Sequence, residues 1–220
     1  LQPQRTLLLA ISRSGTTTET VRAVDHFPRM GGGVGVAITC YPDSELAHQA
    51  DVVGATPAAG EQSVAQTRSF TSMLLAVQAL AGALEGADLV TLDRLPQLAT
   101  DLLDQAREPM RRIARNPAAD SFYFLASGAL FGIAAEAMLK LKEMSLTSSE
   151  AYHFMEFRHG PMSMCDPSAV VVGLLSAERA QLERAVLNDV RPMGPQLVVV
   201  GPGEDPPVPA DLPPWARPAL

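Results

Sequence analysis

The chain has 220 residues, 47% of them hydrophobic and 19% charged, which is enough to bury the core of one large domain or two small ones. This composition excludes a disordered or collagen-like chain. The 24 acidic and 17 basic residues give a formal net charge of -7, so no basic surplus is available for a nucleic acid or an anionic membrane surface. The longest uncharged stretch, residues 69–84, is too short and too polar to span a bilayer.

The two cysteines, Cys40 and Cys165, lie far apart in the sequence and belong to no metal-binding pattern. We therefore expect neither a disulfide framework nor a metal site, and a reducing cytoplasmic environment fits best. The chain begins Leu1-Gln2-Pro3 and shows no signal-peptide pattern, from which we expect an incomplete N-terminus.

Six short apolar runs rich in β-branched residues predict strands, in chain order, at residues 6–12, 34–40, 51–56, 122–126, 169–176 and 196–200. Helical periodicity predicts helices between them at residues 17–27, 44–50, 64–85, 95–115, 130–146 and 178–191. The strands are apolar throughout, a pattern typical of parallel sheets covered on both faces. The sequence therefore predicts an α/β fold.

The predicted strands form two groups of three, separated by a long helix that ends before Asn116-Pro117. This organisation predicts a first half at residues 1–92, a connecting helix at 93–117 and a second half at 118–220. A doubly wound half usually has more than three strands, so we expect the chain to be incomplete at both ends. Residues 201–220 hold seven of the 18 prolines and are predicted to form an extended, non-helical exit.

The first candidate site is the segment at residues 12–18, which leaves a strand and opens a helix. A glycine there lets the backbone approach a ligand, and free amides at a helix N-terminus favour an anion. The expected phosphate-binding residues are Ser12, Arg13, Ser14 and Thr17. The alternative is a simple helix cap, with Ser14 or Thr16 as the capping residue and Glu19 completing a capping box.

A second, weaker candidate is the polar segment at residues 60–71, at the front of an otherwise apolar helix. It is placed to line the same cleft from the opposite side. The alternative is an ordinary helix N-terminus, with Glu61 complementing the helix dipole and Arg68 in solvent.

The third candidate is the helix at residues 130–146, where Glu136, Lys140 and Glu143 share one face by their spacing of four and then three residues. A charged stripe of this kind is often only the solvated face of a helix, held by a Glu136–Lys140 pair. Alternatively, Glu143 acts as a general base in a cleft and Lys140 holds an anionic oxygen.

The fourth candidate is the segment at residues 148–164, interpreted as a loop or short-helix region dense in titratable side chains. His159 precedes Gly160-Pro161, a turn signal that places the imidazole on a loop. Histidine suits proton transfer near neutral pH, whereas a structural role is the alternative. No Gly-x-Gly-x-x-Gly or Gly-x-x-x-x-Gly-Lys-Ser/Thr motif follows a strand, so dinucleotide and nucleoside triphosphate cofactors are disfavoured.

At this point the motifs resemble those of the sugar isomerase (SIS) domain family, including the isomerase half of glucosamine-6-phosphate synthase and its stand-alone relatives. Residues 12–17 resemble the family's phosphate loop, usually Ser-Gln-Ser-Gly-Glu-Thr, and residues 61–71 its second sugar-contacting segment. The most specific match is Leu139-Lys140-Leu141-Lys142-Glu143, followed by Glu150-Ala151-Tyr152 and by His159-Gly160-Pro161.

The resemblance implies two SIS halves, each a flavodoxin-like parallel sheet flanked by helices in three layers, and a site for a hexose 6-phosphate. It implies that Glu143 moves a proton between C1 and C2, with assistance from Lys140, and that His159 opens the sugar ring in the neighbouring subunit of a homodimer. It also implies sugar contacts from Val64, Gln66 and Thr67, and no metal or organic cofactor.

Three departures affect the sugar contacts, because the synthases carry Gln at the position of Arg13, Glu at Thr16 and Ser at Gln66. The family's first strand, its C-terminal tail with the Schiff-base lysine and a glutamine-hydrolysing domain are not recognised in the sequence. We therefore expect an amino-sugar-phosphate deaminase that converts glucosamine 6-phosphate to fructose 6-phosphate and ammonia. The alternatives are the isomerase part of a glutamine-dependent aminotransferase, a fructosamine-6-phosphate deglycase and a non-catalytic phosphosugar sensor.

Overall fold

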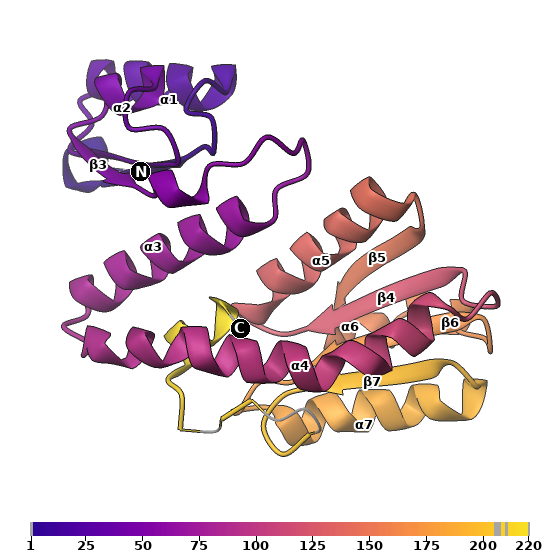
Figure 1. Ribbon diagram of the computed structural model, residues 1–220. Helices are drawn as coiled ribbons and strands as arrows, with labels where there is room; N and C mark the ends of the chain where they lie inside the picture. Colours follow the sequence, from indigo (N-terminus) through magenta and orange to yellow (C-terminus); the bar gives the residue numbers. More distant parts are fainter. Residues whose placement is uncertain (1, 205–207, 210, 220) are drawn as a thin grey trace. The chain divides into compact units, whose positions relative to one another are not determined.

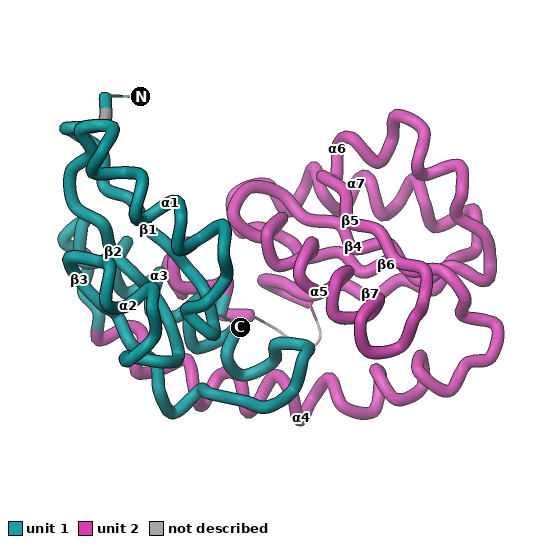
Figure 2. The backbone as a smooth tube through the Cα atoms, turned by 90° about the horizontal axis from the view of Figure 1, so that it is seen from above, with its two compact units in different colours: residues 1–89, 219 teal, residues 90–218, 220 magenta. Residues whose placement is uncertain are grey.

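The structure is a computed structural model that describes residues 2–204, 208, 209 and 211–219. The chain divides after Leu89 into two compact units, coloured separately in Figure 2. Each unit contains its own parallel β-sheet with helices against both faces (Figure 1). The predicted α/β class is therefore confirmed.

Unit 1 has three parallel strands in the order β1-β2-β3: β1 (Leu8–Ile11), β2 (Gly35–Thr39) and β3 (Val52–Ala55). Its α-helices are α1 (Thr18–Arg29), α2 (Glu45–Gln49) and α3 (Arg68–Leu84). All five residues of the central strand β2 are buried, which accounts for its unbroken apolar sequence.

The two faces of this sheet follow the two-residue period of the strands. Ala10 and Ala37 point to one face, where they pack with Val21 of α1 and Leu46 of α2. On the other face the core includes residues of β2 and α3, namely Val36, Ile38 and Met73. The sheet is therefore the middle layer of three.

Unit 2 has four parallel strands in the order β5-β4-β6-β7: β4 (Ser121–Ala126), β5 (Ser148–His153), β6 (Ala169–Leu174) and β7 (Gln196–Val200). Its α-helices are α4 (Leu95–Ala114), α5 (Leu130–Ser145), α6 (Phe154–Phe157) and α7 (Ala180–Val190). The described 3-10 helices of the chain are Pro3–Arg5, Pro57–Ala59, Leu89–Arg94, Pro161–Met164, Arg191–Met193 and Pro214–Ala219.

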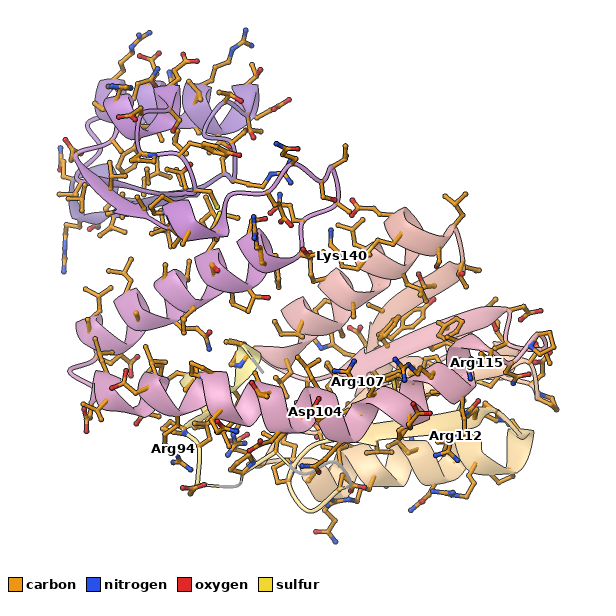
Figure 3. All side chains as sticks on the ribbon, viewed as in Figure 1. Arg94, Asp104, Arg107, Arg112, Arg115 and Lys140 are labelled. Carbon is orange, nitrogen blue, oxygen red and sulfur yellow. The ribbon has the colours of Figure 1, made fainter. Side chains whose placement is uncertain are left out.

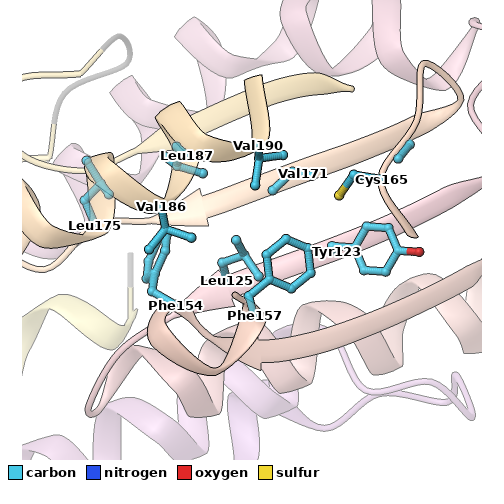
Figure 4. Close-up of a cluster of buried hydrophobic side chains, with 11 residues drawn as sticks. Tyr123, Leu125, Phe154, Phe157, Cys165, Val171, Leu175, Val186, Leu187 and Val190 are labelled. Carbon is cyan, nitrogen blue, oxygen red and sulfur yellow. The ribbon is translucent and has the colours of Figure 1, made fainter. Parts of the chain in front are cut away.

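The largest core of unit 2 lies between its sheet and helices α6 and α7 (Figure 4). Leu125 and Val171 of the sheet are fully buried there together with Phe154, Phe157 and Val186. The Phe157 ring is tilted against Tyr123, with 5.6 Å between the ring centroids. This contact fixes the short helix α6 and therefore the start of the loop that carries His159.

The interpretation of residues 148–164 as a loop or short-helix region is wrong for its first part, because Ser148–His153 forms strand β5. This strand pairs with β4 from Ser121↔Ser148 to Ala126↔His153, so the second sheet has four strands rather than three. β5 is an edge strand, and its buried Ser149 donates a hydrogen bond to the Met138 carbonyl at 2.9 Å. A polar edge strand of this kind lacks the apolar run by which buried strands are recognised.

Most other boundaries shift by one or two residues from the sequence prediction, and two segments differ more. α3 begins at Arg68 rather than at residue 64, because residues 60–67 are held by side-chain hydrogen bonds outside the helix. The predicted non-helical exit at residues 201–220 is wrong at its end, where Pro214–Ala219 forms a 3-10 helix with Ala216 buried. Proline fixes φ near the helical value and fits a short helix of this kind. Residues 205–207, 210 and 220 of this segment lie outside the described residues.

Cys40 and Cys165 are both buried free cysteines. In the described part of the chain no cluster of three or more His, Cys, Asp or Glu side chains is arranged to hold a metal ion. None of the helices that the structure describes is long and apolar enough to cross a membrane.

Phe157→Ala is expected to lower the free energy of unfolding by about 3–5 kcal/mol, because it removes a fully buried ring and leaves a cavity. Chemical denaturation followed by circular dichroism measures the loss. Leu182→Ala is the matched control, since Leu182 of α7 is 59% exposed and its truncation should cost less than about 0.5 kcal/mol. Equal losses in the two variants would contradict the assigned core.

Candidate active site

The first candidate segment connects the carboxyl end of β1 to α1 and is bonded to the neighbouring strand. The Ser12 N–H donates to the Ile38 carbonyl at 3.1 Å, and the Arg13 carbonyl accepts from the Cys40 N–H at 3.1 Å. The Gly15 carbonyl accepts from the Leu46 N–H at 2.9 Å. The loop is therefore held by β2 and the start of α2 before any ligand binds.

Gly15 is the tightest point of this loop. Its φ is +64°, and a Cβ built on it would lie 2.0 Å from Ser44 Oγ and 2.4 Å from Ser44 Cβ. The glycine therefore lets the loop pack closely against Ser44 at the start of α2.

The loop hydroxyls bond to one another and to loop amides. Ser12 Oγ lies 2.8 Å from Thr17 Oγ1 and accepts from the Gly15 N–H at 3.2 Å. Ser14 Oγ accepts from the Thr16 N–H at 3.2 Å and lies 2.9 Å from Thr16 Oγ1. Ser12 is buried, whereas Thr17 is exposed at the mouth of the loop.

The structure does not show the simple helix cap that was the alternative for this loop. Thr17 is the N-cap residue of α1, and no side chain forms a capping hydrogen bond there. The first amides of a helix have no partner within the helix, so those of α1 remain available to an anion. This geometry suits the binding of a phosphate group.

The second candidate segment, residues 60–67, is ordered by Glu61. Its carboxylate accepts hydrogen bonds from the Thr67 N–H at 2.8 Å, from Thr67 Oγ1 at 2.7 Å and from both the hydroxyl and the N–H of Ser69. The hydrogen bonds from Ser69 and Thr67 lower the pKa of Glu61 to about 2. Glu61 thus serves the helix N-terminus, as its alternative interpretation holds, whereas Arg68 donates to the Gly60 carbonyl rather than standing free in solvent.

The predicted sugar-contacting residues Val64, Gln66 and Thr67 lie on this segment. Val64 is 94% exposed and Gln66 is half-buried. Arg13 brings the two segments together, because its Nη1 donates to the Ser63 carbonyl at 2.6 Å and lies 3.4 Å from the Val64 carbonyl. The first two candidate segments therefore meet within unit 1.

The third candidate is a charged cluster on α5 of unit 2, where Figure 3 labels Lys140. Lys140 Nζ lies 2.6 Å from Glu143 Oε2 and 3.3 Å from Glu136 Oε1. The side chains of Lys140 and Glu136 are about one-fifth exposed, and that of Glu143 is 39% exposed. The spacing in the sequence predicted that these three side chains share one face of α5. That face holds the Glu136–Lys140 pair expected of a solvated helix and a second carboxylate, that of Glu143.

Two opposing effects determine the charge of Lys140. Partial burial lowers the pKa of the amine, but the hydrogen bond to Glu143 and the negative charge of Glu136 together outweigh it and raise the pKa above its ordinary value. Lys140 is therefore a cation at neutral pH.

The fourth candidate segment contains two histidines, His153 and His159, whose surroundings differ. His153 stacks on Phe131, with ring centroids 3.9 Å apart, and so has a packing role. His159 is exposed, follows α6 and donates its backbone N–H to the Glu156 carbonyl at 2.9 Å. Gly160 then reverses the chain at φ +135°. Of the two, His159 has the exposure that a proton-transfer group needs.

Sequence reasoning named Glu150 and Tyr152 but missed the hydrogen bond between them, and it missed Thr39 altogether. Thr39, fully buried at the end of β2, donates its hydroxyl to the Arg13 carbonyl at 3.1 Å. Tyr152 donates its hydroxyl to the Glu150 carboxylate, and this bond together with partial burial raises the pKa of Tyr152 to about 12. The available signal was position, since Thr39 ends the strand adjacent to the candidate loop.

Comparison with known proteins identifies the family of the chain. A family model for the SIS domain matches residues 3–83 and 118–204. The chain belongs to the SIS domain family. The two matched stretches contain β1 to β3 and β4 to β7 respectively, so each sheet lies within one matched stretch.

Among curated relatives, the glutamine-fructose-6-phosphate aminotransferase (isomerizing) of Treponema pallidum is 32% identical over 209 residues, covering 89% of this chain and 33% of the relative. The enzyme of the same name from Pseudomonas syringae is also 32% identical, over 213 residues, with 34% of its length covered. The chain thus spans about one-third of the length of these relatives.

Two solved structures extend the comparison. Glucosamine-6-phosphate deaminase from Thermotoga maritima superposes with a TM-score of 0.85 and 29% identity, covering all of this chain and 67% of the deaminase. The C-terminal domain of glucosamine-fructose-6-phosphate aminotransferase from Francisella tularensis gives a TM-score of 0.79 and 26% identity, covering 88% of this chain and 58% of that domain.

Gly15→Ala is expected to weaken binding of inorganic phosphate at least about tenfold, because the new methyl group would force the loop away from Ser44 and a positive φ is costly for alanine. Calorimetric titration with inorganic phosphate measures the loss. Gly132→Ala is the control, since a Cβ at Gly132 on α5 meets nothing within 4 Å. Unchanged phosphate affinity in Gly15→Ala would show that the loop is not the anion site.

The carboxyl carbon of Glu61 is expected to titrate near pH 2 in an NMR experiment, well below the ordinary Glu value of 4.5. Because the folded pKa is depressed, Glu61 stabilises residues 60–69 fully above pH 4.5 and progressively loses that effect as the pH falls toward 2. Thr67→Val with Ser69→Ala removes the two hydroxyl donors, leaves the two backbone N–H donors in place, and should move the midpoint toward its ordinary value. A midpoint near 4.5 in the unmodified protein would contradict the bonding described.

Proposed function

We propose that this protein is an aldose-ketose isomerase that acts on amino-sugar 6-phosphates, most specifically as a deaminase of glucosamine 6-phosphate. The observation that carries this proposal is the Lys140–Glu143 contact of 2.6 Å on α5, which places a carboxylate and an amine side by side on one helix. Family membership and the uncapped loop before α1 support the same substrate class. We further propose that residues 1–92 and 118–220 are two SIS halves joined by residues 93–117.

The phosphate group of the substrate would bind at the loop after β1. Ser14 and Thr17 offer hydroxyls, Ser12 braces the loop from its buried position, and the first turn of α1 offers backbone amides. Val64, Gln66 and Thr67 would contact the sugar from the second segment. The phosphate group is remote from the reacting carbons C1 and C2. Binding it would therefore orient the sugar without any contact to those carbons.

The chemistry requires one base that both removes and returns a proton. In the open-chain aldose, Glu143 would take the proton from C2, giving an enolamine, and return it to C1, giving an iminium at C2. Water then adds to C2 and ammonia leaves, so glucosamine 6-phosphate and water yield fructose 6-phosphate and ammonia. Lys140, held as a cation, would stabilise the oxygen that bears negative charge during the transfer.

His159 would open the sugar ring by transferring the proton of the hemiacetal hydroxyl. Its exposure and its position before Gly160 suit a group that reaches beyond its own subunit. We therefore propose a homodimer in which His159 serves the partner's active site. Two buried free thiols are compatible with a reducing cytoplasm as its location.

Two findings favour different fates of the nitrogen, namely its release as ammonia or its transfer from glutamine. The full coverage of this chain by the Thermotoga maritima deaminase structure supports ammonia release. The 32% identity to glutamine-fructose-6-phosphate aminotransferases supports the second candidate, synthesis of glucosamine 6-phosphate within a longer protein. Both candidates use the same proton shuttle, so the assays must separate them by the nitrogen source.

The deciding assay measures ammonia and fructose 6-phosphate formed from glucosamine 6-phosphate by the complete protein in the absence of glutamine. We expect both products in equal amounts. Glucosamine 6-phosphate formed only from fructose 6-phosphate and glutamine would instead establish the aminotransferase. Turnover of a fructosamine 6-phosphate alone would identify a deglycase, and binding of these phosphosugars without turnover of any would identify a sensor.

Glu143→Gln is expected to retain binding of fructose 6-phosphate while its kcat falls by at least about two orders of magnitude, because the amide cannot accept the C2 proton. Single-turnover kinetics with calorimetry separates the two effects. Glu136→Gln is the matched variant, since Glu136 faces the same amine at 3.3 Å and loses the same charge. Equal losses in both variants would show that the charge beside Lys140, rather than a proton shuttle at Glu143, determines the rate.

A further inference from the structure

Arg13 belongs to the phosphate loop, yet its side chain bonds the backbone of a different segment. Its Nη1 donates to the Ser63 carbonyl at 2.6 Å and approaches the Val64 carbonyl at 3.4 Å, across 50 positions of sequence. The Arg13 carbonyl is itself fixed by the Cys40 N–H and the Thr39 hydroxyl. The residue therefore connects the end of β1 and β2 to the tip of residues 60–67.

We propose that Arg13 is a positioning residue that sets the place of the sugar-contacting segment, and that it does not act as a phosphate ligand. This inference rests on the proposed function for the identity of the ligand. It replaces the expectation, based on its place in the loop, that Arg13 contacts the phosphate directly.

The segment depends on this connection because it has little other support. Residues 60–67 belong to no helix or strand. Glu61 and Arg68 close the segment on itself, through Thr67 and Ser69 in one case and Gly60 in the other. Among the hydrogen bonds described for the residues of this segment, those from Arg13 reach its tip at residues 63 and 64 from another part of unit 1.

Arginine is well suited to this position. Its planar guanidinium has five N–H donors on a long side chain, so it can serve two successive carbonyls in a fixed geometry. A glutamine amide is shorter and uncharged, and a lysine amine lacks the fork. In the described hydrogen bonds the guanidinium donates to the carbonyls of residues 63 and 64, whereas the loop hydroxyls bond one another.

The functional consequence is that the two segments would bind different parts of the substrate. The phosphate would be bound by the hydroxyls of the loop and the amides of α1, whereas Arg13 would decide where Val64, Gln66 and Thr67 meet the sugar. Removing Arg13 should thus affect recognition of the sugar much more than recognition of phosphate alone.

The test uses Arg13→Ala, Arg13→Lys and the unmodified complete protein, with inorganic phosphate and fructose 6-phosphate as separate probes. In Arg13→Ala we expect the Kd of inorganic phosphate to change less than about threefold and that of fructose 6-phosphate to rise about tenfold or more, the size of one charge-assisted hydrogen bond. Arg13→Lys should recover part of that loss. Hydrogen exchange at residues 60–69 should accelerate in Arg13→Ala and less so in Arg13→Lys.

Arg22→Ala is the matched control, because it removes the same charge from an exposed position on α1. A parallel loss of affinity for both probes in Arg13→Ala, with unchanged exchange at residues 60–69, would overturn the proposal and make Arg13 a phosphate ligand. If the unmodified protein binds neither probe, the proposed function fails. In that case the exchange experiment still decides whether Arg13 positions the segment, and Arg13→Lys provides the comparison if Arg13→Ala does not fold.

Discussion

The close approach of Gly15 to Ser44 is the constraint on which the arrangement of unit 1 depends. Ser44 stands at the start of α2, where its hydroxyl accepts from the Ala47 N–H at 3.4 Å, and a Cβ on Gly15 would lie only 2.0 Å from that hydroxyl oxygen. Leu46, in the same turn, donates its N–H to the Gly15 carbonyl. The turns after β1 and β2 are thus interlocked, and neither can move without the other.

The position of residues 60–67, the second segment of the candidate site, depends indirectly on the same contact between the turns after β1 and β2. Arg13 precedes the tight turn, and its backbone is held by Thr39 and Cys40 at the end of β2. Because this backbone is fixed, the bonds of its side chain to the carbonyls of residues 63 and 64 tie that distant loop to the end of β2. The central strand β2, fully buried, thereby determines the place of residues 63 and 64, to which it contributes no direct hydrogen bond among those described.

The sequence predicted the structure well where burial or local spacing determines it. It did not predict the structure where contacts between residues distant in the sequence determine it. The apolar runs identified β2, β4 and β6, and the helical period placed Glu136, Lys140 and Glu143 on one face. The strand β5 was missed because its sequence has no apolar run, unlike that of the edge strand β3, and because its pairing with β4 has no local signal. The bonds of Arg13 to residues 63 and 64 were equally unpredictable, because only the folded sheet brings the two segments together.

The cluster on α5 has a property that a single ion pair would lack. Lys140 faces two carboxylates, Glu143 at 2.6 Å and Glu136 at 3.3 Å. In the proposed reaction Glu143 becomes neutral each time it carries a proton, which would remove the nearest negative charge from the amine. Glu136, 3.3 Å from the amine, takes no part in that proton transfer, and its contact also raises the pKa of Lys140. The amine therefore keeps its charge when negative charge develops on the substrate oxygen, which is when the charge is needed.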